Sequence, residues 1–81
     1  MIAYAVFVTD NQLTWALRGL LYALNDPDRN WQAIEQEWLE VCSAATGTEH
    51  EGAVRASGVL LRLHDADRLA EGMRDLLARL K

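Results

Sequence analysis

A predicted helix that is apolar on nearly every side is the feature that most constrains how this chain can fold. It follows a capping-box pattern at Thr9–Gln12 and runs to about Asn25, with Arg18 among its few polar residues. A helix of this kind must be covered on more than one side. We therefore expect a second helix or a second copy of the chain to cover the side that carries Trp15 and Tyr22. The other side is a leucine stripe, made of Leu13, Leu17, Leu20, Leu21 and Leu24.

Two segments outside this helix are predicted to be strands. Residues 2–8 are apolar at every position and include β-branched and aromatic side chains, which is typical of a strand buried on both faces. Residues 53–63 form the second strand region, in which Gly58 indicates a bulge or a tight turn. The pattern leaves open whether this region is one strand or a short hairpin.

Two further helices are predicted, each with its own start signal. One runs from Pro27 to Ala45, with Asp26 as its N-cap and Gly47 just beyond its end. The other begins after Asp65, a second good N-cap, and runs to Leu80. Each carries an apolar stripe at helical spacing: Trp31, Ile34, Trp38, Val41, Cys42 and Ala45 in the first, and Leu69, Met73, Leu76, Leu77 and Leu80 in the second.

These elements predict a single α+β domain over residues 1–81, with the order β-α-α-β-α and a minimal sheet covered by three helices. Two strands make a poor sheet, and a chain of this length buries only about 60–65 % of its unfolded surface. A homodimer, or a hairpin within residues 53–63, would complete the sheet. The single cysteine, Cys42, excludes a disulfide within the chain, and neither a spanning segment nor a signal peptide is evident. We therefore expect a cytoplasmic protein.

The net charge and its distribution along the chain restrict the classes of partner that the protein could bind. The net charge is −4, and residues 26–51 carry seven acidic side chains against Arg29 alone. Direct binding to nucleic acid needs a basic stripe, and the sequence has none. The acidic middle is either a solvated helix face or a surface for a basic partner.

The aromatic and acidic residues of the first two predicted helices form the candidate interface. Tryptophan and tyrosine are favoured anchors of protein interfaces, because each combines a large rigid apolar body with a polar tip. Packing within the chain against Trp31 and Trp38 is the alternative. The candidate interface residues are Trp15, Arg18, Tyr22, Glu35, Glu37 and Glu40.

Size and charge predict a small acidic protein-interaction module, homodimeric, that acts by binding another protein. An inhibitor or immunity-type protein fits this description, such as a phage-encoded antagonist of a bacterial defence or nucleic-acid-binding machine. The excess of arginine over lysine, together with much alanine and leucine, suggests a bacterial or phage source.

The alternative is a domain that binds a small molecule or a metal, or a small enzyme. Ligands gather where strands end and helices begin, which would bring together Asp10, His64, Asp65 and Asp67. The simpler interpretation of the last two residues is a helix cap and a favourable first-turn charge. Glu49–Glu51 is a poor metal triplet, and no glycine-rich phosphate loop or nucleophile elbow occurs. We expect no cofactor, no metal and no enzymatic activity.

Overall fold

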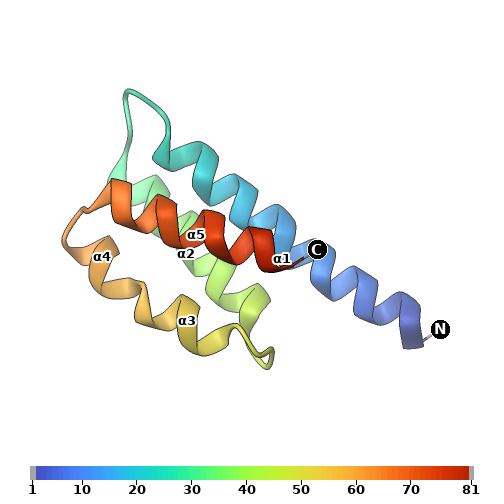
Figure 1. Cartoon of the computed structure of the whole chain (residues 1–81). Coiled ribbons are helices and arrows are strands. Elements are labelled where there is room, and N and C mark those ends of the chain that lie inside the picture. The colour runs from blue at the N-terminus through green and yellow to red at the C-terminus, as the bar shows by residue number, and fades with distance from the viewer. Residues whose placement is uncertain (1, 81) are drawn as a thin grey trace.

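Every regular element that the structure describes is an α-helix. The structure is a computed structural model, and it describes the backbone of residues 2–80 and the side chains of residues 12–80. Figure 1 shows the helices in chain order: α1 (Ile2–Leu24), α2 (Trp31–Ala45), α3 (Glu51–Ala56), α4 (Gly58–Arg62) and α5 (Ala66–Arg79).

The helices form a small bundle with its core between α1, α2 and α5. This helix packs against both α2 and α5, while α3 lies against α2 and α4 against α5. α1 is the longest element, with 23 residues, and its N-terminal part extends beyond the other helices (Figure 1). Despite this length, no helix within the described residues has the combination of extent and hydropathy that crossing a membrane requires.

The core lies where α1, α2 and α5 meet, and it confirms the predicted leucine stripe. Leu13, Leu17, Leu20 and Leu24 of α1 are buried, and Leu21 is half-buried against them. The remaining buried apolar side chains come from all four other helices: Ile34, Val41, Ala45, Val54, Leu61, Leu69, Ala70, Met73 and Leu76.

The predicted strand over residues 2–8 is wrong, because these residues form the first part of α1. An unbroken apolar run has no periodicity of its own, so it does not distinguish a buried strand from a helix. The expected capping box at Thr9–Gln12 is also wrong, since the helical backbone continues through it.

The predicted strand or hairpin over residues 53–63 is wrong as well, since this region forms α3 and α4. Its buried apolar side chains are Val54 and Leu61, seven residues apart, which is the spacing of one helix face. Gly58 marks no bulge: a Cβ atom there would lie 3.2 Å from Cζ2 of Trp38, so the glycine makes room for that ring. The fold class is therefore all-α over residues 2–80, and the α+β assignment with a minimal sheet is overturned.

The loop between α1 and α2 differs from the prediction at one end only. α2 begins at Trp31 instead of Pro27, because the side chain of Asn30 accepts hydrogen bonds from the two backbone N–H groups at positions 32 and 33, at 2.9 and 3.3 Å. Asp26 accepts from the backbone N–H of Asp28 instead of capping the helix. The predicted stop is confirmed, since Gly47 follows the C-cap of α2 with φ of 81°.

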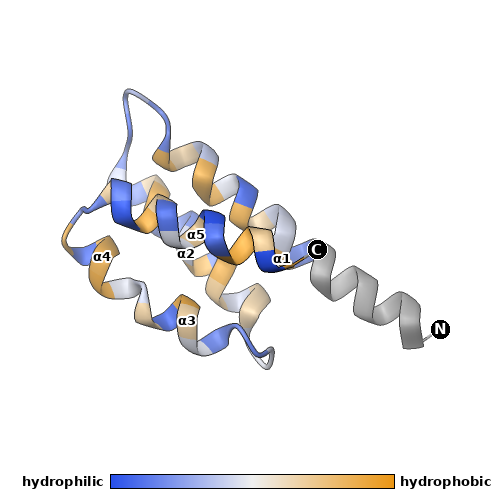
Figure 2. Ribbon diagram, in the orientation of Figure 1, coloured by the Kyte–Doolittle hydropathy of each residue, from blue (hydrophilic) through white to orange (hydrophobic). Residues whose placement is uncertain are grey.

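The predicted last helix is confirmed. Asp65 is the N-cap of α5, and its carboxylate accepts from the backbone N–H of Arg68 at 3.2 Å. The predicted stripe of α5 faces the core, with its first three members buried and Leu77 and Leu80 half-buried. Hydrophilic residues cover the rest of the helix, so α5 is clearly two-sided (Figure 2).

Candidate functional site

Trp15 and Tyr22 lie exposed on one face of α1. Their exposed fractions are 68 % and 82 %, which is far above the usual exposure of such large rings. Arg18 lies between them in the sequence. Its guanidinium is 5.6 Å from the centre of the Trp15 ring, which is within the range of a cation–π interaction. The expectation that a second helix of the same chain covers this face is therefore wrong. We call Trp15, Arg18 and Tyr22 the aromatic face.

The two tryptophans that were the alternative, internal cover for this face pack elsewhere. Trp31 stacks on His64, with ring centres 4.3 Å apart and the planes within 3° of parallel. Trp38 lies against Gly58, and its Nε1–H donates to Oγ of Ser57 at 2.9 Å. Both rings are half-buried against the core, so neither is available to the aromatic face.

A groove of about 670 Å³ runs beside the aromatic face, between α1 and α2. Small side chains line part of it, while Trp15, Glu37 and Glu40 provide its large and charged walls. We call it the α1/α2 groove, and its lining residues are Gln12, Trp15, Ala16, Glu37, Glu40, Ser43 and Ala44.

Glu37 is positioned by a close approach to the backbone of α1. A Cβ atom at Gly19 would lie 3.1 Å from Oε2 of Glu37, so the carboxylate lies directly against the glycine. Glu37 is half-buried and Glu40 is exposed. No arginine among residues 12–80 is within ion-pair distance of either carboxylate.

The third predicted acidic residue, Glu35, lies apart from these two. It lines a second groove, of about 330 Å³, together with Trp31 and His64. The structure therefore brings Glu37 and Glu40 together with Trp15 and separates Glu35 from them. The sequence analysis placed the three glutamates in one interface. Spacing along a helix shows which residues share a face, but it does not show which other helix each face packs against.

Of the alternative cluster of Asp10, His64, Asp65 and Asp67, the structure describes the last three side chains, and these do not come together as a metal-ligating group. Asp65 caps α5 and lies 3.7 Å from Nε of Arg68, while Asp67 is exposed in the first turn of that helix. His64 has a positive φ of 55° and stacks on Trp31. Asp10 falls within α1, and its side chain lies outside the described ones. No group of metal-ligating residues is found in this part of the chain.

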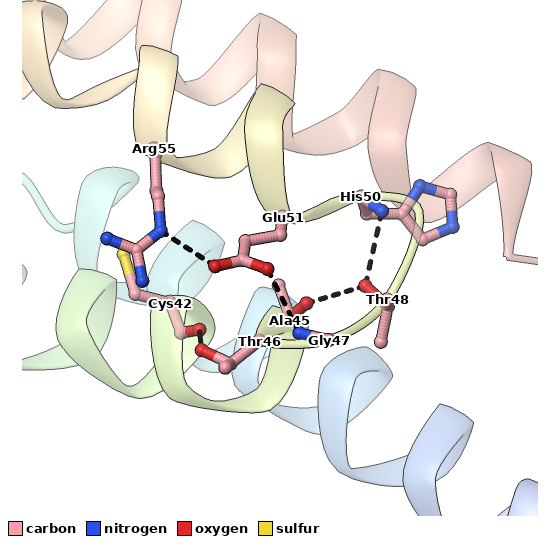
Figure 3. Close-up of polar contacts among 8 residues, drawn as sticks. All are labelled: Cys42, Ala45, Thr46, Gly47, Thr48, His50, Glu51 and Arg55. Carbon is pink, nitrogen blue, oxygen red and sulfur yellow. Dashed lines mark hydrogen bonds and ion pairs between the residues drawn. The ribbon is translucent and has the colours of Figure 1, made fainter.

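The segment Glu49–Glu51, considered above as a metal triplet, belongs to a structural turn between α2 and α3 (Figure 3). The Glu51 carboxylate accepts from the backbone N–H of Gly47 and from Nε of Arg55, each at 3.1 Å. These two contacts hold the pKa of Glu51 below its ordinary value, the Gly47 hydrogen bond being the larger cause, against a smaller opposing effect of burial. The two contacts join the turn to the first residues of α3, which begins at Glu51.

Neutralising this carboxylate is expected to make stability less dependent on pH. The folded-state pKa of Glu51 lies below its ordinary value of 4.5. The ionised carboxylate therefore makes its full contribution to the free energy of unfolding above pH 4.5, and this contribution is lost as the pH falls through the lowered pKa. Glu51→Gln should therefore be less stable than the wild type at pH 7, and the difference should shrink as the pH falls below 4.5. Urea midpoints measured across this range test the expectation. Glu71→Gln, an exposed change on α5, is the matched control and should leave the profile unchanged.

Cys42 is half-buried beside the core, and its setting is not that of a nucleophile. Burial raises the pKa of its thiol, and the nearby charge of Arg55 opposes this only in part. A raised pKa leaves little thiolate at neutral pH, and thiolate is the reactive form. The prediction that Cys42 is a small core residue agrees with its packing.

Comparison with known proteins assigns the chain to no family. No family model, no curated protein and no solved structure matches the chain. The function is therefore inferred from the residues described above.

Proposed function

We propose that this chain is a small protein-interaction module that binds a partner through the aromatic face of α1 and the adjoining α1/α2 groove. The observation that carries the proposal is the exposure of Trp15 and Tyr22 on the part of α1 whose other sides pack against α2 and α5. Rings of this size in an ordered helix are typical anchors of protein interfaces.

The Trp15 and Tyr22 rings are large enough to anchor a protein interface. Each aromatic side chain buries about 150–250 Å² when it is fully covered, and a standard interface needs roughly 800 Å² from each partner. Trp15 and Tyr22 would supply a large share of that area, and the lining of the groove would supply more. The arginine between them adds a polar group at the centre of the face.

The role that fits such a module is that of an inhibitor or immunity-type protein, which acts by covering the surface of another protein. Nothing in this role needs a cofactor or a reaction. The lone cysteine favours a reducing compartment, which makes the cytoplasm the proposed place of action. A second copy of the chain is the other possible occupant of the same face.

Solution mass is the first test, measured by light scattering over a dilution series of the wild type and of W15A/Y22A. Both changes remove exposed side chains, so the variant should keep the wild-type fold. A dimer that the variant does not form means that the partner is a second copy. A monomer directs the search to a foreign protein, which is captured from a cell extract, identified, purified and bound again.

V59A/L63A is the matched control, because it removes two exposed apolar side chains from α4 and the residue that follows it. We expect rebinding of the purified partner to fail with W15A/Y22A and to persist with V59A/L63A. Equal behaviour of the two variants, in mass and in binding, would contradict the proposal.

A further inference from the structure

The α1/α2 groove combines an aromatic ring with two carboxylates that no arginine of the described residues neutralises. Glu37 is half-buried against Gly19, so its charge is held in place and partly shielded from water. Glu40 lies about one helical turn further along α2 and lines the same groove. Trp15 lines it from α1. A fixed carboxylate, an exposed one and an indole ring therefore border one space.

The sign of the charge distinguishes between possible occupants. A second copy that met this one groove to groove would bring its own Glu37 and Glu40 to the contact, where like charges oppose association, and its Arg18 already lies against its own Trp15 ring. Nucleic acid is disfavoured for the same reason. The other end of the aromatic face is also acidic, since Tyr22 lines a shallow depression with Asp26. A foreign protein with a basic surface is the complementary partner.

We infer that the α1/α2 groove receives an arginine side chain from a basic segment of a foreign protein; this inference rests on the function proposed above. A guanidinium is planar, stacks on an indole and donates hydrogen bonds to carboxylates, so it suits all three groups that border the groove. The Trp15 ring is 68 % exposed, so part of it stays accessible to a partner although the Arg18 guanidinium lies 5.6 Å from its centre.

The test uses a blocked alanine-based helical peptide with two arginines four residues apart, added to ¹⁵N-labelled protein. The three tryptophans give three indole N–H signals, and the Trp15 signal is identified by its loss in W15F. We expect the peptide to shift the Trp15 signal and to leave those of Trp31 and Trp38 in place. The same peptide with glutamine at both arginine positions should produce no shift.

Two double variants with the same change in net charge locate the site. E37Q/E40Q removes both carboxylates of the groove and should weaken peptide binding about fivefold, with a smaller dependence on salt. E35Q/E71Q removes two exposed carboxylates elsewhere and should bind like the wild type. Equal affinities of the two variants, or a wild type that does not respond to the peptide, would overturn the inference.

These outcomes are separable from failure of the proposed function. If the wild type ignores the arginine peptide but still binds a partner that W15A/Y22A does not bind, the groove inference is wrong and the interaction module remains. A homodimer that depends on Trp15 and Tyr22 would likewise overturn the groove inference and leave the interaction module in place. If the peptide response and the effect of W15A/Y22A are both absent, both proposals are wrong.

Discussion

Leu17→Ala is expected to lower the free energy of unfolding by about 3–5 kcal/mol. Leu17 has no exposed surface and lies in the middle of the leucine stripe of α1. Truncation removes the transfer free energy of its buried methyl and methylene groups and leaves a cavity that the surrounding helices fill only in part. A domain of this size has a total stability of roughly 4–12 kcal/mol, so this single change should bring the chain close to unfolding.

Urea unfolding followed by the helical circular dichroism signal measures this loss. Leu39→Ala is the matched control, because Leu39 is 48 % exposed on α2 and its loss should cost well under half as much. Similar losses for both variants would mean that the core lies elsewhere than between α1, α2 and α5.

Gly58→Ala is expected to destabilise the fold by about 1–3 kcal/mol, although alanine is the better helix former. The added Cβ atom would lie 3.2 and 3.3 Å from two carbons of the Trp38 ring. That ring cannot easily move away, because it is rigid and its Nε1–H is hydrogen-bonded to Ser57. The steric cost should therefore exceed the gain in helix propensity.

Gly72→Ala separates these two effects. Gly72 is exposed in the interior of α5, and a Cβ atom there would meet nothing within 4 Å. Only the helix propensity remains, so this variant should be more stable than the wild type by about 0.5–1 kcal/mol. Thermal unfolding of the two variants should show opposite shifts, and a stabilised Gly58→Ala would refute the contact with Trp38.

The sequence predicted the helices that carry both a start signal and a periodic apolar stripe. Asp65 followed by the stripe of the last helix is such a case, and α5 begins and ends close to the predicted residues. The start of α2 was misplaced because several good capping residues precede it. Asn30 lies next to the first packed turn, and so it caps the helix in place of Asp26.

Both strand predictions were based on local patterns that do not by themselves distinguish a strand from a helix. Residues 2–8 offer no polar residue that could reveal a period. In residues 53–63 the spacing of Val54 and Leu61 indicated one helix face, but Gly58 was interpreted as a break in a strand. Its role depends on a ring that lies 20 residues earlier in the chain, which no local pattern reveals.

The candidate site was predictable in part. The seven-residue spacing of Trp15 and Tyr22 placed them on one face, as the structure has them. The α1/α2 groove was not predictable, since it depends on how α2 lies against α1 and on the close approach of Glu37 to Gly19. The stacking of Trp31 on His64 depends in the same way on tertiary packing.

The packing of α1 against both α2 and α5 has a consequence for how the chain folds during its synthesis on the ribosome. Translation releases α1 before α5, so α1 needs a helix that is made later to complete its packing. During synthesis the nascent chain can pair α1 with α2, but the leucines of α1 that pack against α5 stay uncovered until α5 has been made. A stop codon before Ala66 would therefore yield a product without a closed core, one that quality-control proteases should remove.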